Sequence, residues 1–267
     1  MKFEKTEVWG FKHALRGMRN PKESWSKSNS HYRGIDEPED EEKIINGDYY
    51  EIGQNDLELA QKLIRAGSVH RKFMRQIFVS VDITAPLYWW KEFDTYKVGT
   101  VANSTSTMHK LASTPITKEC FEMDDYSENL YNIGKREFHL QNYWFDILEC
   151  LEGLRQKYNE TKDKRYWKEL IRLLPESWLQ TRTVTLNYEN LLAICSPDQR
   201  RNHKLTEWSK SFIGWAKSLP YANELLFVDK KRGVDFVMKY ENGIFKYKYN
   251  SGEEFESSDG KTWVQIL

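Results

Sequence analysis

The sequence predicts an α+β fold in which helices flank a central sheet and a short antiparallel β appendage follows. Residues 77–83 (IFVSVDI) alternate bulky apolar with small or polar side chains, which is typical of a half-buried strand. Residues 55–67 (NDLELAQKLIRAG) carry apolar residues at helical spacing between an Asn and a closing Gly, which predicts a helix. The segment FKYKY and two turn pairs, Asn-Gly and Asp-Gly, predict C-terminal hairpins. We therefore expect a main domain at 1–225 and a β-hairpin appendage at 226–267.

Composition narrows the class of protein. Lys and Arg number 40, as do Asp and Glu, so no net field favours non-specific binding to nucleic acid, and we expect no sequence-specific nucleic-acid partner. Three widely spaced cysteines predict reduced thiols in a cytoplasm, with no disulfide framework and no metal site. No leader-like opening and no apolar run near ~18 residues is present, which predicts no membrane partner. Most of the ten tryptophans are expected in the core or at subunit contacts.

The N-terminal elements are predicted in order along the chain. A short strand is expected at residues 7–11, and a helical turn at 13–18 that the pair Asn20-Pro21 breaks. The break has a polar and basic character, which favours either closure over a phosphate or a solvated turn. The residues that give it this character are Arg16, Arg19, Ser24, Ser28 and Ser30. Residues 31–48 are acidic and predict a surface loop, and a strand is expected within 49–53.

The prediction depends most on residues 70–111, in the middle of the chain. His70, Arg71, Lys72 and Arg75 precede the strand at 77–83 and form either an anion site or a surface charge run. Pro86 then opens a helix over LYWWKEFDTYKV, because a first helical position needs no N–H. Residues 100–109 (TVANSTSTMH) are dense in hydroxyl and amide groups, which compete with helical hydrogen bonds and predict a loop.

Helices and one strand fill the second half. Loop and short helix are expected at 115–125, and two helices within 129–175, separated by the polar turn YNETKDK. The first helix should bury a stripe formed by Phe145, Ile147, Leu148, Leu151 and Leu154. Residues 181–186 alternate and predict a strand. A helix at 199–220 should bury a face made of Leu205, Trp208, Phe212, Ile213 and Trp215.

Two separated segments resemble the flavin-dependent thymidylate synthases (the ThyX family). The order of strand, Pro-led helix and polar loop resembles the region that carries the family signature RHRxxS and the following NExSxRY. Residues 173–192 (LLPESWLQTRTVTLNYENLL) are similar to the family segment LP…T-R…T-x-N-x-x-x-L. The two matches stand in the same order as in the family and cover roughly residues 50–225, so the resemblance implies a ThyX-like fold.

The signature itself is not intact. Aligned without gaps, RHR falls on Thr95, Tyr96 and Lys97, and the motif Ser falls on Thr100. The family's Asn-Glu falls on Ala102 and Asn103, and its later Arg-Tyr falls on Met108 and His109 when one residue is inserted. An Arg guanidinium matches a phosphate with a planar fork, whereas Lys97 offers a point charge. The chain therefore resembles a divergent member of the family.

The resemblance implies a function and a set of site residues. It implies a protein that acts on or binds a dUMP-like pyrimidine nucleotide with FAD as cofactor, in a homotetramer with sites between subunits. The implied cofactor-binding residues are His70, Arg75, Tyr96, Lys97, Thr100 and Asn187. The implied nucleotide-binding residues are Asn103, Ser104, Thr105, Ser106, Arg182, Arg200 and Arg201. The last two also crowd a predicted helix start, where basic side chains favour an anion.

Two alternatives stay open. The altered signature leaves undecided whether the chain is an enzyme, and a non-catalytic protein that sequesters a nucleotide, perhaps in a phage setting, fits the same residues. A plain structural oligomer is the third interpretation. The colour of bound flavin separates the first function from the other two.

Overall fold

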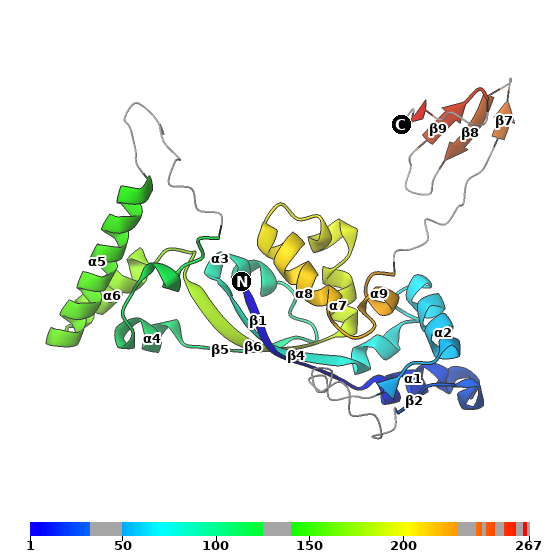
Figure 1. Ribbon diagram of the computed structural model, residues 1–267, viewed down its shortest axis with the longest axis horizontal. Coiled ribbons are helices and arrows are strands. Elements are labelled where there is room, and N and C mark those ends of the chain that lie inside the picture. The colour runs from blue at the N-terminus through cyan, green and yellow to red at the C-terminus, as the bar shows by residue number, and fades with distance from the viewer. Residues whose placement is uncertain are drawn as a thin grey trace, which may run out of the picture.

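Four antiparallel strands form the central sheet of the computed structural model, in the order β1-β4-β6-β5 (Figure 1). Their bounds are β1 Lys2–Trp9, β4 Phe78–Pro86, β5 Val101–Ser104 and β6 Leu179–Asn187. The structure describes residues 1–32, 50–124 and 140–228, and then 239–241, 244–248, 254–259 and 264–265. The predicted α+β class with a central sheet is confirmed.

One face of this sheet is buried and the other is polar. On β4, Val79, Val81 and Ile83 are at most 1% exposed, whereas the alternate residues Ser80 and Asp82 are half-buried. Successive strand residues point to opposite faces, so the alternation in the sequence becomes a division between the two faces. The apolar side is called the covered face below, and the side that carries Ser80 and Asp82 is called the open face.

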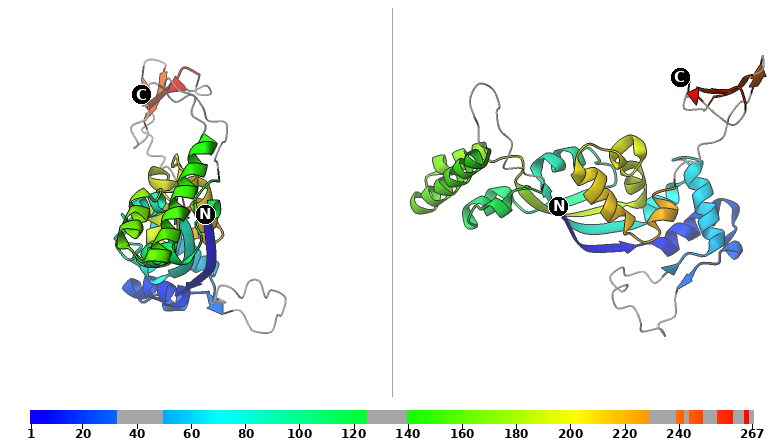
Figure 2. Two further views of the ribbon diagram at one scale, coloured as in Figure 1. Left: turned by 90° about the vertical axis from the view of Figure 1, so that its left-hand side faces the viewer. Right: turned by 45° about the horizontal axis from the view of Figure 1, so that its top comes forward.

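Helices cover the apolar face and extend the sheet at both ends. The covering helices are α3 Leu87–Phe93, α7 Tyr188–Ile194, α8 Ile213–Lys217 and α9 Ala222–Leu225. At one end lie α4 Thr107–Ser113, α5 Leu140–Thr161 and α6 Lys164–Leu173, and at the other α1 Phe11–Arg19 and α2 Gln54–Arg65 (Figures 1 and 2). Short 3₁₀ turns occupy Asn20–Lys22, Trp25–Lys27, Lys72–Gln76 and Lys118–Cys120.

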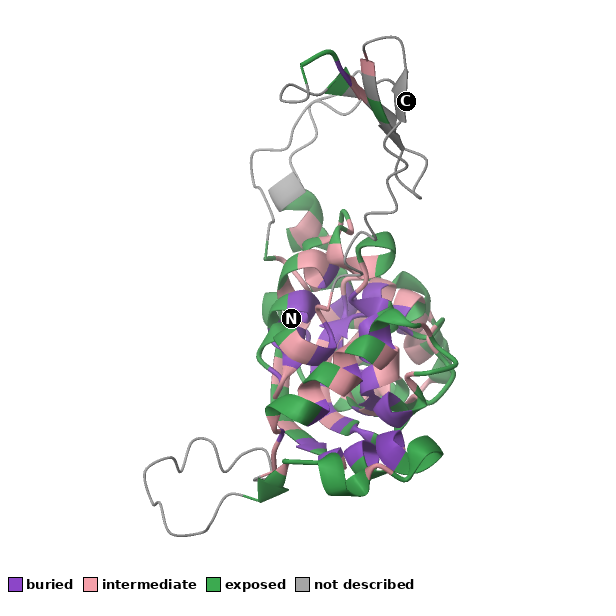
Figure 3. Cartoon of the chain, turned by 90° about the vertical axis from the view of Figure 1, so that its right-hand side faces the viewer, coloured by how far each residue is buried: buried purple, intermediate pink, exposed green. Residues whose placement is uncertain are grey.

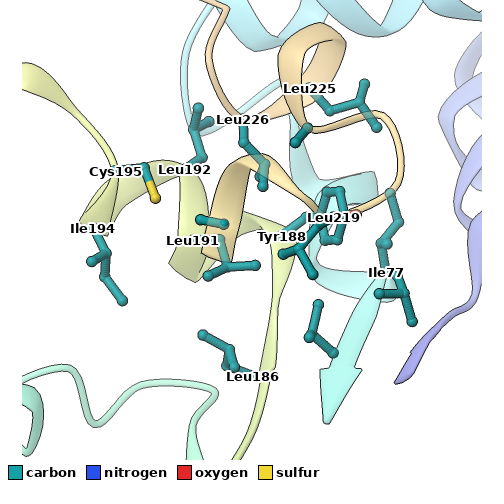
Figure 4. Close-up of a cluster of buried hydrophobic side chains, with 14 of the residues drawn as sticks. Ile77, Leu186, Tyr188, Leu191, Leu192, Ile194, Cys195, Leu219, Leu225 and Leu226 are labelled. Atoms are coloured by element: carbon teal, nitrogen blue, oxygen red, sulfur yellow. The ribbon is translucent and has the colours of Figure 1, made fainter. Parts of the chain in front are cut away.

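Two apolar clusters hold these elements together. The main cluster lies under the covering helices (Figure 3), and it includes Leu186 of β6 and Leu191 and Ile194 of α7 (Figure 4). A second cluster ties the α4–α6 end together and contains Leu111, Ile116, Phe121, Leu151, Leu170 and Trp178. Trp89, Trp90 and Trp208 are at most 1% exposed, so these three tryptophans are core residues as expected.

The N-terminal strand begins and ends earlier than predicted. It runs from Lys2 to Trp9, and Phe11 belongs to α1. Gly10 makes this corner with a φ of +99°, and a Cβ there would lie 2.1 Å from the Gln76 carbonyl oxygen. A glycine is therefore required, because it alone fits both the left-handed conformation and the close backbone approach.

The acidic stretch at 31–48 is framed by a small hairpin. His31–Tyr32 (β2) pairs antiparallel with Tyr50–Glu51 (β3), so two residues predicted as loop are strand; residues 33–49 lie outside the described part. Helix α2 begins at Gln54 after Gly53, and Asn55 is not its N-cap. The Asn55 backbone N–H instead donates to Asn29 Oδ1 (3.1 Å).

The predicted loop at residues 100–109 is wrong in most of its length. Val101–Ser104 is an edge strand that pairs with β6, and α4 starts at Thr107 with Ser106 as its N-cap. Short polar side chains oppose a helix interior, but an edge strand leaves them in solvent while its backbone pairs with a neighbour. The tertiary pairing with β6 therefore outweighs the local preference for a loop.

The helical predictions of the second half hold with shifted bounds. Leu151 is 1% exposed and Ile147, Leu148 and Leu154 pack on the second cluster, but Phe145 is 67% exposed and lies off the predicted stripe. Helix α5 continues to Thr161 through most of the predicted polar turn. The expected helix at 199–220 is split into turns at Pro197–Arg201 and Glu207–Phe212 followed by α8. Its predicted apolar face is buried, with Leu205 only partly so.

The C-terminal region forms its own antiparallel sheet in the order β10-β9-β8-β7, which agrees with the predicted β appendage. The strands are β7 Lys239–Glu241, β8 Ile244–Lys248, β9 Glu254–Ser257 and β10 Val264–Gln265. Strands β7 and β8 pair antiparallel, and the predicted turn pair between them, Asn242-Gly243, lies outside the described part.

Candidate functional site

The loop that joins α3 to β5, residues 94–100, gathers several of the predicted site residues; it is called the α3–β5 loop below. It lies on the start of α7, where Asn190 Nδ2 donates to the Val98 carbonyl oxygen (2.6 Å). Gly99 has a φ of +75°, and a Cβ there would lie 2.9 Å from Asn187 Nδ2. One glycine and two asparagines thus fix this loop on the start of α7.

Asn187 is also the N-cap residue of α7. Its Oδ1 accepts from the Asn190 backbone N–H (3.0 Å), and Asn190 Oδ1 accepts from the Asn187 backbone N–H (3.2 Å). This reciprocal capping box starts α7 and leaves Asn187 only 7% exposed. The predicted cofactor residue therefore presents at most its Nδ2 group to a ligand.

Arg182 lies on the covered face and is held from three sides. Its guanidinium stacks on the Trp90 ring at 4.2 Å, its Nε donates to Gln180 Oε1 (2.9 Å), and its Nη1 pairs with Asp94 Oδ1 (2.8 Å). The predicted phosphate ligand is thus already neutralised by a carboxylate at the end of α3. Asp94 is 51% exposed, so this pair is screened by water.

Arg200, in the turn Pro197–Arg201, has a similar set of contacts. Its Nη1 pairs with Glu92 Oε2 (2.5 Å), its Nε donates to the Tyr96 hydroxyl (2.9 Å), and its guanidinium lies 4.7 Å from the Trp208 ring. Trp208 Nε1 also donates to Glu92 Oε2 (2.8 Å). Arg182 and Arg200 therefore both have carboxylate partners from α3 and its C-terminal end, and Trp208 also orients Glu92.

Lys97 and Thr100 are the unengaged polar groups of the α3–β5 loop. Lys97 is exposed, and its amine has no hydrogen bond or ion pair with any described residue. The Thr100 hydroxyl oxygen is buried and has no hydrogen-bond partner among the described atoms. A buried hydroxyl without a partner costs free energy, so it marks a position where a ligand atom or water completes the bonding.

His70 and Arg75 lie at the same end of the sheet as Asn187. Arg75 is in the 3₁₀ turn Lys72–Gln76, which packs against α7, and both side chains are exposed. Arg71 between them pairs with Glu189 of α7 (3.0 Å). The predicted charge run is therefore divided: one cation secures the turn to α7, and the others face solvent.

The sheet divides the predicted nucleotide-binding residues between its faces. Ser104 lies opposite Arg182 in the register, whereas Asn103 lies opposite Thr183 on the open face. Thr105 donates through both its backbone N–H and its hydroxyl to the Thr181 carbonyl oxygen (2.8 and 3.1 Å). Ser106 caps α4 by accepting from the His109 backbone N–H (3.3 Å).

Arg201 is engaged apart from the other nucleotide-binding candidates. Its Nε donates to the Cys195 carbonyl oxygen (2.9 Å) and its guanidinium lies 5.1 Å from the Phe227 ring. It therefore secures the C-terminal end of α7.

Residues 20–29 of the polar N-terminal break are mostly exposed, as the solvated-turn alternative predicts, whereas Arg19 before them is buried. Closure over a phosphate stays a prediction. Arg19 Nε pairs with Asp56 Oδ1 (2.6 Å), and the hydroxyls of Ser28 and Ser30 donate to Asp56 Oδ2. Burial raises the pKa of Asp56, but the hydrogen bonds from Ser28, Ser30 and Arg19 outweigh it and hold that pKa below its ordinary value. Sequence reasoning missed Asp56 because it stands inside an amphipathic helix.

The described residues contain no group of three or more His, Cys, Asp or Glu side chains placed to hold a metal. Of the helices in the described ranges, none combines the length and the apolar character that crossing a bilayer requires.

Solved structures of similar fold include a flavin-dependent thymidylate synthase, ThyX, from Helicobacter pylori complexed with FAD and dUMP. It matches 85% of this chain and 98% of its own chain at 15% identity with a TM-score of 0.56, and a second structure of that enzyme with FAD and dUMP matches at 0.55 and 14% identity. The UMP/dUMP methylase PolB from Streptomyces cacaoi, bound with 5-Br dUMP, matches at 0.50 and 16% identity over 85% of this chain. No family model and no curated protein sequence matches the chain. The fold expected from the two sequence segments is confirmed.

Proposed function

We propose that this protein binds a dUMP-like pyrimidine nucleotide together with FAD, as a flavin-dependent thymidylate-synthase-like protein with an altered signature. The observation that carries the proposal is the structural match over 98% of a ThyX chain complexed with FAD and dUMP. The α3–β5 loop stands at the position of the altered signature and holds the residues that best fit a ligand.

The residues of this loop fit a phosphate-bearing cofactor with fewer cations than the family signature has. Lys97 offers an unpaired ammonium group, and the buried Thr100 hydroxyl lacks a partner. His70 and Arg75 are exposed near the start of α7 and supply further donors. Bound FAD would supply hydride transfer, and the chain's own residues would bind and orient it.

For the nucleotide we assign Arg182, with Ser104 beside it on the covered face. The guanidinium of Arg182 uses Nε and Nη1 for Gln180 and Asp94, and a phosphate would have to share or displace Asp94. Asp94 is half exposed, so its displacement costs at most about 1 kcal/mol. Arg200 is bound more tightly by Glu92 and Tyr96, and we assign it to the positioning of Tyr96.

Binding measurements on the purified chain test the proposal. We expect a yellow protein, or saturable quenching of added FAD fluorescence, and calorimetric binding of dUMP. Lys97→Ala should weaken FAD binding about tenfold, because one charge-assisted hydrogen bond is lost. Lys62→Ala, which removes an exposed lysine of α2, is the matched control and should change nothing. Absence of saturable FAD and dUMP binding would rule the function out.

Turnover then separates the enzyme from the sequestering protein. If dUMP and FAD bind and a reductant and one-carbon donor yield a methylated nucleotide, the protein is an enzyme. If dUMP binds without flavin and without turnover, the non-catalytic function replaces our proposal. The altered signature makes this second measurement necessary, since binding alone fits both functions.

The assembly and its setting belong to the same proposal. We infer a cytoplasmic homotetramer with sites between subunits, a main domain at residues 1–225 and an appendage at 226–267. Light scattering of the full chain at several concentrations measures the oligomeric state, and a monomer would remove the shared sites.

A further inference from the structure

Asn190 joins the first turn of α7 to the α3–β5 loop through the two ends of its side-chain amide. Its Oδ1 accepts from the Asn187 backbone N–H (3.2 Å), which completes the capping box of α7. Its Nδ2 donates to the Val98 carbonyl oxygen (2.6 Å), 92 positions away in the chain. The same amide therefore caps a helix and holds the backbone of the loop.

The loop lies directly on this capping box. A Cβ at Gly99 would lie 2.9 Å from Asn187 Nδ2 and 3.2 Å from Asn190 Oδ1, so no larger side chain fits between them without a shift. Gly99 also has a φ of +75°, which favours glycine. A change in the Asn190 amide therefore acts at once on Val98 and on the residue that follows it.

A second contact holds the other side of Lys97. The Tyr96 hydroxyl accepts from Arg200 Nε (2.9 Å), but this bond fixes a side chain, whereas the Asn190 bond fixes the loop backbone. Lys97 lies between the two held residues and is exposed, and the Thr100 hydroxyl oxygen is buried without a partner among the described atoms. The groups left for a ligand are thus positioned by their neighbours in the loop.

We propose that Asn190 is a positioning residue of the candidate flavin site, which sets the places of Lys97 and Thr100 by holding the Val98 carbonyl oxygen. The inference rests on the proposed function, because it takes FAD to bind beside the α3–β5 loop. Asn190 acts through the loop and not on the cofactor. A loop that is held before the cofactor arrives loses less conformational freedom on binding, which favours affinity.

Two substitutions separate the bond to the loop from the cap of the helix. Asn190→Asp keeps an oxygen that accepts from the Asn187 backbone N–H, but it replaces the donor to Val98 with a second acceptor. Two acceptors repel each other, so the loop is released while α7 stays capped. Asn190→Ala removes both bonds without adding a charge, and it therefore controls for repulsion between the new carboxylate and the phosphates of FAD.

Asn159 provides a matched control at the other end of the molecule. Its Nδ2 donates to the Ala112 carbonyl oxygen (2.8 Å) and so joins α5 to α4. Both asparagines are half-buried. Asn159→Asp therefore removes the same kind of bond and adds the same charge, far from the α3–β5 loop.

The first measurement tests the loop without any cofactor. Trypsin cleaves after Lys97 only when the loop leaves its anchors, so the rate of this cut reports how often the loop opens. Mass spectrometry follows the peptide bond between Lys97 and Val98 in digests of the full chain. We expect cleavage about tenfold faster in Asn190→Asp and Asn190→Ala, and the wild-type rate in Asn159→Asp.

The second measurement tests the flavin site. Both Asn190 variants should bind FAD about tenfold more weakly in fluorescence titrations, and the visible absorbance band of bound FAD should shift. Asn190→Asp should keep the wild-type midpoint of urea unfolding, because the cap of α7 remains. A residue that only capped the helix would not change affinity and absorbance while leaving stability unchanged.

Unchanged cleavage after Lys97 in both Asn190 variants would overturn the proposal, and so would unchanged FAD affinity and absorbance in both. Weaker binding by Asn190→Asp alone would assign the effect to charge repulsion and would also overturn it. Equal changes in Asn159→Asp would do the same. If the wild type fails to bind FAD, the proposed function fails, and the cleavage rates then decide by themselves whether Asn190 holds the loop.

Discussion

The two faces of the central sheet hold their polar groups in different ways. On the covered face, Arg182 and Arg200 each stack on a tryptophan and pair with a carboxylate of α3 before any ligand arrives. On the open face, the side chains of β4 and β6 form cross-strand pairs of short hydroxyls such as Thr84 with Thr181, and lysines beside them stay unpaired. The comparison shows that the arginines near the core are used in ion pairs that stabilise the fold. The cations that remain available to a ligand are the lysines at the edges of the sheet.

The ion pairs of the described residues also differ among themselves in how deeply they are buried. Asp56 is fully buried with Arg19, whereas Asp94 is half exposed with Arg182. Removal of one partner leaves an uncompensated buried charge in the first pair, but only a solvated one in the second. The predictions below use these contrasts, from the largest expected effect to the smallest.

Asp56→Ala should lower the free energy of unfolding by about 3–5 kcal/mol, because buried Arg19 loses its counter-charge and the hydroxyls of Ser28 and Ser30 lose their acceptor. Asp94→Ala, which opens an exposed pair, should cost less than about 1 kcal/mol. Urea denaturation followed by circular dichroism measures both. Equal losses in the two variants would contradict the contrast.

Leu186→Ala should cost about 2–5 kcal/mol, since it leaves a cavity in the main cluster on the covered face. Thr185→Ala, one residue earlier on the open face, should change the free energy of unfolding by about 0.5 kcal/mol or less. The same denaturation experiment applies. A large loss at Thr185 would show that another element covers the open face in solution.

The stability of the protein should fall on the acid side through Asp56. Its pKa is lower in the folded state than in the unfolded state, so its contribution is complete above the unfolded pKa, near about 4. The contribution is then lost as the pH falls through the lower folded value. Thermal unfolding between about pH 6 and pH 3 should show a shallower decline for Asp56→Asn than for the wild type. Parallel curves would remove this assignment.

Thr183→Ala should have a small effect, at most about 1 kcal/mol, because only one cross-strand hydrogen bond to Asp82 is lost on an exposed surface. Differential scanning calorimetry resolves a change of this size. The test sharpens the comparison, since Thr183 and Val184 are adjacent but point to opposite faces.

Most elements of the fold could be predicted from the sequence, but fewer features of the candidate site could. The alternation of 77–83 and of 181–186 predicted β4 and β6 because strand period is local. The strand at Val101–Ser104 was missed, since its polar composition predicts a loop and only pairing with β6 overrides it. The two helical segments of the second half were found, although Phe145 was assigned to the wrong side of α5.

The candidate site shows which contacts sequence patterns do not predict. The sequence identified Arg182 and Arg200 as cations but gave no sign that Asp94 and Glu92 would hold them, because these contacts join residues about a hundred positions apart. The sequence singled out Arg19, Ser28 and Ser30 but gave no sign that Asp56 would hold them, because these contacts also join separate segments of the chain. A carboxylate on the otherwise apolar face of a helix, such as Asp56 in α2, is the sequence signal that could have predicted this buried ion pair.

One titration tests the central claim that FAD binds beside the α3–β5 loop on the covered face of a ThyX-like sheet. FAD fluorescence quenching is measured with the wild type, Lys97→Ala and Lys110→Ala under identical conditions. Saturable binding that Lys97→Ala weakens about tenfold, and that Lys110→Ala leaves unchanged, is the expected result. Absence of saturable binding to the wild type, or weakening by Lys110→Ala alone, would contradict it.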